Sequence, residues 1–339
     1  MRILVTGGCG FLGSHFVRAR LRQHSQDTIV NADYLTYAGS LDNLEEAADN
    51  PRHHHVLVDV SNTAALEPLW DDRFDLIVHF AAETHVDRSL ENAGAFVRTN
   101  VVGTQSLLAA VQRHRSDGPD PVIVIVSTDE VYGPTPEGQT FLPDQPLAPT
   151  SPYAASKAAA DMIALAYAAS LDLDITVVRS VNVYGARQYP EKLIPLFVAR
   201  GLAGENLPLY GDGRQRRSWL YVDDFVDGLS TICTDDGKRR TQSIWHLGSA
   251  EETENISLAE QICDLCEIDR GLIQFVSDRP GHDRRYALDY SETAATFDWQ
   301  PRTQLSDGLS RTVAWIRGNR EWARGRLGWM PIFLRGDRT

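Results

Sequence analysis

The sequence predicts an α/β fold in which a doubly wound parallel sheet is followed by a smaller C-terminal α/β lobe. Residues 122–126 are five consecutive aliphatic residues, a pattern typical of a strand buried on both faces of a parallel sheet. Strand-like and helix-like segments alternate from residue 2 to residue 180, as in repeated strand-helix units. From residue 182 onward, turn residues and charged residues mix with short apolar segments, which indicates a second lobe.

The alternation assigns each element in order. The expected strands cover residues 2–6, 27–31, 55–58, 74–80, 122–126 and 174–180. One helix is expected directly after the first turn, and further helices are expected at residues 62–70, 95–114, 153–169 and 305–317. We therefore divide the chain into a Rossmann domain at 1–181, a lobe at 182–325 that is interleaved with it, and a tail at 326–339.

The composition excludes several classes of partner. The 339 residues carry a formal net charge of -13, which opposes nonspecific binding to nucleic acid or to anionic membranes. The chain starts on a strand-like segment and has no run of about 18 apolar residues, so we expect a cytoplasmic protein without membrane contact. Its four cysteines are too few and too unevenly spaced for a disulfide framework.

A glycine-rich turn at Gly7, Gly10 and Gly13 follows the first expected strand and opens the first expected helix. In that context glycines let the backbone approach a pyrophosphate, and the helix N-terminus stabilises its charge. Asp33 ends the next strand, where an acid hydrogen-bonds the adenosine ribose and repels a 2′-phosphate. The turn therefore predicts bound NAD rather than NADP. Its Gly-x-x-Gly-x-x-Gly spacing resembles that of the short-chain dehydrogenase/reductase superfamily.

Tyr153 and Lys157 lie four residues apart at the start of an alanine-rich helix, and therefore on one helix face. Taken alone, such a pair is usually a lysine chain lying over a surface tyrosine. Beside a nucleotide site and Thr128, the phenol can instead act as a base. Its ordinary pKa is about 10, so Lys157 and an oxidised nicotinamide must stabilise the phenolate.

Thr128, Asp129 and Glu130 directly follow the apolar strand at 122–126. Ligands of open α/β sheets bind beyond the carboxyl ends of the strands, which favours a chemical role for these side chains. Asp-Glu after a strand is also a common solvated loop start, when considered alone. The proline-rich loop at 134–152 comes next, and loops of this length are often lids.

Two clusters suggest a metal site, but a structural interpretation fits each one better. Residues 53–55 are all histidines between a helix and a strand, where a loop entering the strand is the simpler interpretation. Cys263 and Cys266 follow a capping box at 257–260, which places both on a packed helix without a second cysteine pair. We predict no metal.

The second lobe carries residues that suit a nucleotide ligand. Tyr210 offers an aromatic face on which a base can stack. Arg214, Arg216 and Arg217 can bind phosphate in a bidentate manner, although each could also lie in a solvated basic turn. An anionic ligand needs such a cluster because the chain is acidic overall.

With these residues in place, the sequence resembles the dTDP-glucose 4,6-dehydratases over residues 1 to about 320, the most specific part being Ser-Thr-Asp-Glu-Val-Tyr-Gly at 127–133. Members of that family characteristically have an Asp-Glu pair directly after the hydroxyl residue, which is Thr128 in this chain. The related UDP-glucuronate decarboxylases typically have Ser in place of that Asp, and the 4-epimerases lack the pair. The segments 81–89, 190–195, 209–213 and 278–286 match the family as well.

The resemblance implies a lyase that converts dTDP-glucose to dTDP-4-keto-6-deoxyglucose for deoxysugar biosynthesis. Tyr153 would take the O4 proton while the C4 hydride moves to NAD⁺, Glu130 would remove the C5 proton, and Asp129 would protonate the leaving C6 hydroxyl. The hydride would then return to C6, so that NAD stays bound and is regenerated in each turnover. A homodimer packed through the helices at 95–114 and 153–169 is also implied.

The resemblance carries a set of site residues onto this chain. The catalytic set is Thr128, Asp129, Glu130, Tyr153 and Lys157. The cofactor set is Gly7, Gly10, Phe11, Leu12, Gly13, Asp33, Tyr34, Leu35, Thr36, Asp59, Val60, Ala81, Ala82, Thr99, Tyr153 and Lys157. The substrate set is His85, Thr128, Asn182, Lys192, Leu193, Pro208, Tyr210, Arg217, Arg279 and His282.

The chain departs from the family pattern at four positions in or near the second lobe, namely Val183, Ser218, Phe225 and Glu251, the last in place of a substrate-binding Asn. These changes leave the chemistry intact, leave the nucleotide base open and hint at a secondary-metabolite pathway. The alternatives are a UDP-sugar decarboxylase, a 4-epimerase, or an inactive sugar-nucleotide-binding module. Asp129 speaks against the first two, and the intact catalytic set speaks against the third.

Overall fold

The core of the protein is a seven-stranded sheet in which the strands run in the order β10-β6-β5-β4-β1-β2-β3. The computed structural model describes residues 1–71, 73–115, 118–239 and 243–328. All neighbouring strands in this sheet are parallel. Their bounds are β1 Arg2–Thr6, β2 Thr28–Asp33, β3 His53–Leu57, β4 Leu76–His79, β5 Val122–Thr128, β6 Ile175–Ser180 and β10 Ile244–Leu247.

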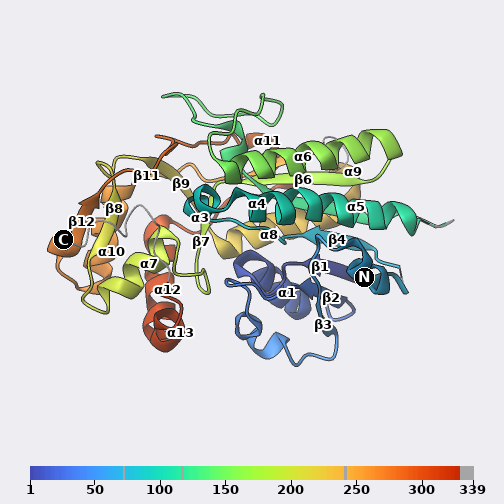
Figure 1. Ribbon diagram of the computed structural model, residues 1–339, viewed down its shortest axis with the longest axis horizontal. Coiled ribbons are helices and arrows are strands. Elements are labelled where there is room, and N and C mark those ends of the chain that lie inside the picture. Colours follow the sequence, from blue (N-terminus) through green and yellow to red (C-terminus); the bar gives the residue numbers. More distant parts are fainter. Residues whose placement is uncertain (72, 116–117, 240–242, 329–339) are drawn as a thin grey trace.

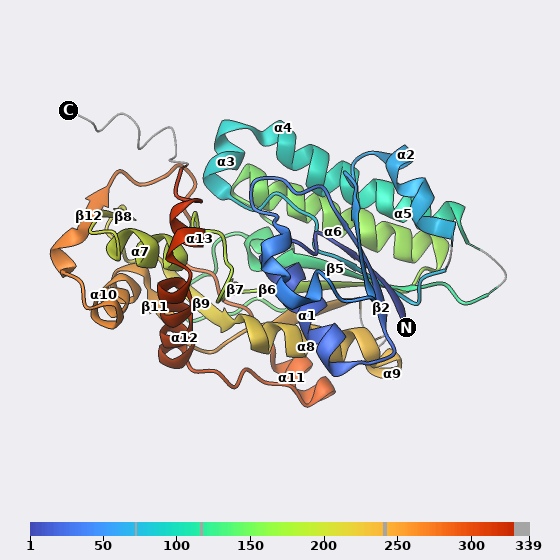
Figure 2. The ribbon, with the colours of Figure 1, turned by 90° about the horizontal axis from the view of Figure 1, so that it is seen from below.

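Strand β5 is buried on both faces, as its apolar sequence predicts. Ile123 and Ile125 pack in one cluster with α5 (Gly103–Arg113) and α6 (Pro152–Leu171). Val124 and Val126 point to the other face and pack in a second cluster with α1 (Phe11–Gln23) and α8 (Val222–Thr234). Figure 2 shows these two helical layers on either side of the sheet, which confirms the doubly wound fold.

The six predicted strands are all present, with bounds shifted by a few residues. The seventh, β10, was not predicted because it is short and comes from the second half of the chain. Since β10 pairs with β6, we propose that the lobe at 182–325 is interleaved with the domain at 1–181. The prediction of a loop before residue 55 was wrong, because His53 and His54 already belong to β3 and His53 is buried.

The expected long helix at 95–114 is divided into three segments. It consists of α4 (Ala93–Phe96), a π-helical segment (Val97–Val102) and α5. Helix α3 (Val86–Glu91) precedes it, and the expected helix at 62–70 is α2 (Thr63–Leu66) followed by a 3₁₀ turn (Glu67–Asp71). Two further helices, α9 (Asp236–Arg239) and α11 (Ser291–Phe297), flank the sheet near β10.

The second lobe lies beside the Rossmann sheet, at the left of Figure 1. It contains a three-stranded sheet in the order β11-β9-β7 and the pair β12-β8. The strands are β7 Asn182–Tyr184, β8 Leu207–Tyr210, β9 Arg216–Tyr221, β11 Glu252–Glu254 and β12 Ile273–Val276, and the helices are α7 Leu193–Gly201, α10 Asn255–Cys266, α12 Leu305–Gly318 and α13 Arg320–Arg324. The predicted capping box at 257–260 is wrong, because α10 begins at Asn255.

The proline-rich loop at 134–152 is hydrogen bonded to residues 285–289 of the second lobe. The backbone of Phe141 is hydrogen bonded to Ala287 and Asp289 at 3.0 and 2.9 Å. Arg285 donates from Nη1 to the carbonyls of Pro136 and Gln139, at 2.7 and 2.6 Å. Arg285 also forms an isolated β-bridge with Arg216. These bonds hold the loop against the second lobe.

Within the described ranges, no helix is long and apolar enough to span a membrane. Residues 329–339 of the predicted tail lie outside the described residues.

Candidate active site

The glycine-rich turn between β1 and α1 leaves space that side chains would fill. A Cβ on Gly13 would lie 2.3 Å from the carbonyl oxygen of Gly7, and a Cβ on Gly7, whose φ is +73°, would lie 2.6 Å from the nitrogen of Ala81. Only glycine permits this close passage of three backbone segments. The turn lines a cavity that also contacts Asp33 and Tyr153. At this first cavity, backbone N–H groups at the N-terminus of α1 can bind a pyrophosphate.

Asp33 stands at the end of β2, on the side of the cavity where the ribose is expected. Its Oδ2 accepts from the backbone nitrogen of Cys9 and its Oδ1 from that of Leu35, each at 2.8 Å. These bonds fix the carboxylate and leave its remaining lone pairs toward the cavity. Of the predicted cofactor set only Leu35 does not line this cavity; its side chain packs against the core instead.

The N-terminal turn of α6 brings Tyr153 and Lys157 to the same cavity. Ser151 caps this helix by accepting from the backbone nitrogen of Ala154, and Pro152 occupies the first turn. Lys157 donates from Nζ to the carbonyl of Val126 at 2.8 Å, which anchors the ammonium to β5. Burial, followed by the charge of Glu130, raises the pKa of Tyr153. Burial lowers the pKa of Lys157.

Asp129 and Glu130 begin a 3₁₀ turn (Asp129–Tyr132) at the carboxyl end of β5. Asp129 is only 3% exposed, and burial, with the charge of Glu130, raises its pKa to about 7. Burial also raises the pKa of Glu130, while Arg279 and Lys192 lower it. The two adjacent carboxyls therefore lie in different surroundings, which suits one to act as an acid and the other as a base.

A fully buried ion pair between Asp161 and Arg179 lies one helical turn beyond Lys157. Asp161 lies one turn further along α6 and accepts from Nε of Arg179 at 2.9 Å. The charge of Asp161 raises the pKa of Lys157, against the effect of burial. Arg179 also donates to the hydroxyl of Tyr132, which is hydrogen bonded to Nε2 of His246 at 2.7 Å. This network joins α6, β6 and β10 beneath the candidate catalytic residues.

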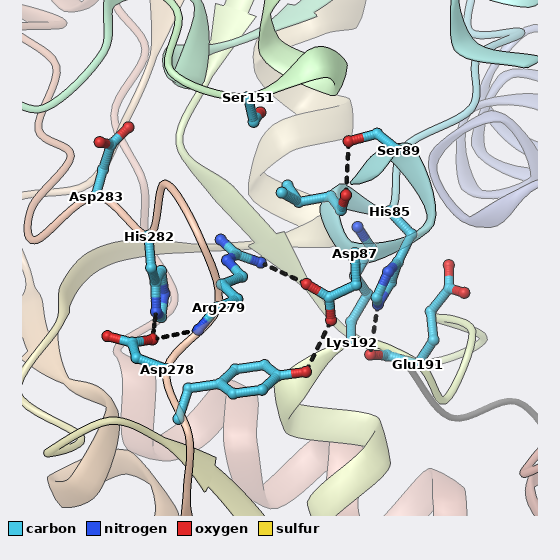
Figure 3. Close-up of polar contacts among 12 residues, drawn as sticks. His85, Asp87, Ser89, Ser151, Glu191, Lys192, Asp278, Arg279, His282 and Asp283 are labelled. Carbon is cyan, nitrogen blue, oxygen red and sulfur yellow. Dashed lines mark hydrogen bonds and ion pairs between the residues drawn. The ribbon is translucent and has the colours of Figure 1, made fainter. Parts of the chain in front are cut away.

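A second cavity adjoins the first, and Glu130, Asn182 and Lys192 line both. Apart from Thr128, which lines the first cavity, the predicted substrate set lies here: His85, Asn182, Lys192, Leu193, Pro208, Tyr210, Arg217, Arg279 and His282. Figure 3 shows several of these around the cavity, with Asp278 joining Arg279 and His282. Four buried or half-buried cations line it, as an anionic ligand requires: Lys192, Arg200, Arg217 and Arg279.

Asp87 was not predicted as a site residue, although the polar run at 81–89 pointed to this region. Its Oδ2 accepts from the Tyr210 hydroxyl at 2.9 Å, and its Oδ1 accepts from Nη1 of Arg279 at 3.4 Å. Figure 3 shows it reaching from α3 toward Arg279 of the second lobe. Asp87 therefore fixes the orientation of two ligand-facing side chains from the opposite wall.

Glu191 was also missed as a site residue. It joins residues 34–40, here called the cofactor loop, to residues 185–192, here called the substrate loop. It accepts from the Tyr37 hydroxyl at 2.8 Å and from Nε of Arg88 at 2.9 Å. The Arg88 guanidinium lies 3.9 Å from the centre of the Tyr37 ring. Lys192 donates to the carbonyl of Thr84 at 2.6 Å. Glu191 and Lys192 therefore lie on one anchored loop, and both residues line both cavities.

The expectation for Glu251 was wrong. Its Oε2 accepts from the backbone nitrogen of Leu305 at 2.8 Å, at the start of α12 rather than at the cavity. Asn255 lines the substrate cavity from this part of the chain, and its side chain is buried. The sequence spacing did not show this because the chain bends at Ala250 and then forms β11 before α10 begins.

The described part of the chain contains no group of three or more His, Cys, Asp or Glu residues able to hold a metal ion. All four cysteines are free and buried. Burial raises the pKa of Cys266 to about 11, as for a packed thiol rather than a thiolate ligand.

Comparison with known proteins gives consistent matches. Residues 4–312 match the family model described as GDP-mannose 4,6 dehydratase. A dTDP-glucose 4,6-dehydratase of Actinoplanes sp. is 46% identical over 329 residues, which cover 95% of this chain and 99% of that protein. The dTDP-glucose 4,6-dehydratase of Streptomyces venezuelae, solved with NAD and dTDP bound, is 41% identical with a TM-score of 0.88, over 96% of this chain and 99% of that one. A UDP-glucose 4-epimerase of Thermus thermophilus, solved with NAD, is 28% identical with a TM-score of 0.85, over 94% of this chain and 99% of that one.

Proposed function

The chain belongs to the GDP-mannose 4,6 dehydratase family of the extended short-chain dehydrogenases/reductases, and from this premise we propose how its residues divide the work of dehydration. It converts dTDP-glucose to dTDP-4-keto-6-deoxyglucose with tightly bound NAD. The epimerase match shows that the fold alone does not select this reaction. The observation that selects it is the Asp129–Glu130 pair, with Asp129 buried and Glu130 half-buried, in the same cavity as Tyr153.

The first cavity fits NAD⁺. The glycine turn admits a pyrophosphate at the N-terminus of α1, and Asp33 accepts the ribose hydroxyls. When bound, NAD would supply the hydride acceptor for C4 and the hydride donor for C6. Every other requirement of the reaction is a proton transfer or a positioning task for the side chains of this chain.

Tyr153 acts as the base that takes the O4 proton during oxidation at C4. Burial opposes the phenolate, so a nearby positive charge must stabilise it. Lys157 supplies part of that charge and is held by Val126 and by the charge of Asp161. Thr128 supports the phenol through its side-chain hydrogen bond, which lowers the pKa of Tyr153.

Glu130 and Asp129 then divide the elimination of water. The new C4 ketone acidifies the C5 hydrogen, which Glu130 removes as a base; nearby Arg279 and Lys192 favour its charged form. Asp129 protonates the C6 hydroxyl as it leaves. A pKa of about 7 keeps a large fraction of Asp129 protonated at neutral pH, which is what a general acid needs.

The second cavity binds the nucleoside diphosphate part of the substrate. Arg217 and Arg279 have the fork geometry for its phosphate oxygens, and Lys192 adds a point charge between the cavities. Tyr210, oriented by Asp87, presents its ring to the base.

Mass spectrometry of the product tests this function. With dTDP-glucose, the mass should fall by that of one water molecule. An unchanged mass would favour the epimerase or the inactive module. Loss of carbon dioxide from a UDP-uronate, with dTDP-glucose left intact, would favour the decarboxylase.

We propose that the protein forms a homodimer through the helices at 95–114 and 153–169. Large apolar side chains are exposed on this face: Val97 by 49%, Val102 by 40% and Met162 by 64%. Contiguous exposed apolar side chains indicate an interface. Met162→Glu should therefore yield monomers in analytical sedimentation, whereas a dimer unaffected by this change would place the interface elsewhere.

A further inference from the structure

Asp283 of the second lobe is hydrogen bonded to the chain just before α6. Its Oδ2 accepts from Oγ1 of Thr150 and from the Tyr286 hydroxyl, the latter at 2.6 Å. Thr150 precedes Ser151, the cap of α6, and Tyr153 lies in the first turn of that helix. Figure 3 shows Asp283 and Ser151 on the two lobes. One carboxylate oxygen therefore joins the helix that carries Tyr153 to the lobe that carries most of the second cavity.

Asp283 also contacts the guanidinium that binds the diphosphate in the proposed function. Its main-chain carbonyl accepts from Nη2 of Arg217 at 2.9 Å. Cζ of Arg217 lies 4.3 Å from the centre of the Tyr286 ring, and both side chains line the second cavity. Asp283 and Arg217 are 8% and 5% exposed, so their contact is shielded from water. Asp283 therefore acts on the second cavity through Arg217 and Tyr286.

The substrate of the proposed function has to span both lobes. Its diphosphate binds at Arg217 in the second lobe, and its C4 hydroxyl must reach Tyr153 on α6. The fit of the sugar to Tyr153 thus depends on how the two lobes are joined. A shift of about 1 Å between reacting groups can slow a reaction roughly a hundredfold. Resting on the proposed function, we propose that Asp283 is a positioning residue, which sets Tyr153 against the sugar by joining the start of α6 to the diphosphate site.

A second threonine of the proline-rich loop at 134–152 provides a matched comparison. Oγ1 of Thr135 accepts from the backbone nitrogen of Ala287 at 3.0 Å, and the backbone nitrogen of Thr135 donates to the carbonyl of Arg285 at 2.9 Å. Thr135 is 5% exposed, whereas Thr150 is an exposed residue. If the loop only had to be fastened to the second lobe, loss of the buried Thr135 hydroxyl should matter at least as much as loss of the Thr150 hydroxyl.

Thr150 is a better place than Asp283 itself to break this connection. Burial raises the pKa of Glu130, and the charge of Asp283 raises it further, so a change of Asp283 would also alter the proposed base. Thr150→Val removes only the hydroxyl that reaches Asp283, and it keeps the contacts of Asp283 with Tyr286 and Arg217. Thr150→Ser restores the hydroxyl and is the conservative variant.

The experiment measures binding and chemistry separately in the NAD-loaded protein. Calorimetric titration with dTDP gives the Kd of the diphosphate site, and dehydration of dTDP-glucose gives kcat. Thr150→Val should lower kcat roughly ten- to a hundredfold, because the sugar is misplaced relative to Tyr153. Its Kd for dTDP should stay at the wild-type value, because Arg217 keeps its contacts. Thr150→Ser should have the kcat of the wild type, and Thr135→Val should keep most of it.

An unchanged kcat in Thr150→Val would overturn this role of Asp283, as would an equal loss of kcat in Thr135→Val or a Thr150→Ser as slow as Thr150→Val. A Kd for dTDP that rises as far as kcat falls would also overturn it, because Asp283 would then only shape the binding cavity. If Thr150→Val does not fold, Thr150→Ala is held to the same outcomes. Absence of water loss in the wild type would instead overturn the proposed function.

Discussion

The Tyr37 hydroxyl of the cofactor loop donates a 2.8 Å hydrogen bond to Oε1 of Glu191 in the substrate loop. Both loops line the cofactor cavity, so this bond joins two segments that would enclose NAD. A hydrogen bond to a charged group contributes about 1.5–3 kcal/mol. Tyr37→Phe should accordingly release NAD roughly ten- to a hundredfold faster, measured as NAD retained after gel filtration. Tyr167→Phe on α6 is the matched control, and equal retention in both variants would contradict the closure.

The rate of elimination should decrease above about pH 7. Burial and the Glu130 charge raise the pKa of Asp129 to about 7, and only protonated Asp129 can donate to the leaving hydroxyl. As pH rises through this value, the acid form declines tenfold per unit. The decay rate of transient NADH in single turnovers should follow the same slope. A decay rate that stays constant or increases between neutral and alkaline pH would rule out Asp129 as the acid.

Asp161→Asn should destabilise the protein strongly. Asp161 and Arg179 are 0% and 1% exposed, and removing one partner of a buried ion pair costs about 3–5 kcal/mol. Asp120→Asn breaks the exposed pair with Arg115, and its cost should be below about 1 kcal/mol. Urea unfolding of both variants measures the two free energies, and similar losses would mean that the buried pair is not a special support of Lys157.

Glu130→Gln should stop the reaction after the oxidation step. The amide cannot take the C5 proton, so reduced cofactor should accumulate on the enzyme when dTDP-glucose is added, while product formation falls by roughly a hundredfold or more. NADH absorbance reads the first step and mass spectrometry the second. The same change at exposed Glu205 should alter neither. If Glu130→Gln shows no NADH, then Glu130 acts before elimination.

Local sequence predicted most of the residues that the structure brings together around the first cavity. The glycine turn, Asp33, and the Tyr153–Lys157 pair each act through neighbours within one strand-helix unit, so spacing alone places them. The Asp129–Glu130 pair was predictable because residues 122–126 of β5 are all apolar and the strand ends at the carboxyl edge of the parallel sheet.

The substrate half was predicted through resemblance, and its supporting residues were missed. Asp87 contacts Tyr210 and Arg279, which lie 123 and 192 residues away in sequence. Such contacts depend on how the lobes pack, which no local pattern encodes. β10 and Glu251 were misjudged for the same reason, since a short strand from the second lobe completes the sheet and a bend before α10 changes which residue faces the cavity.

The proposed division of roles is tested most directly by running the wild-type reaction in deuterated water and locating deuterium in the product by NMR. Because Glu130 exchanges its proton with solvent before C5 is reprotonated, the dehydrated sugar should carry deuterium at C5, and the methyl group at C6 should carry the hydrogen that began at C4. A product that has lost water but holds its original hydrogen at C5 would contradict elimination through Glu130 and Asp129.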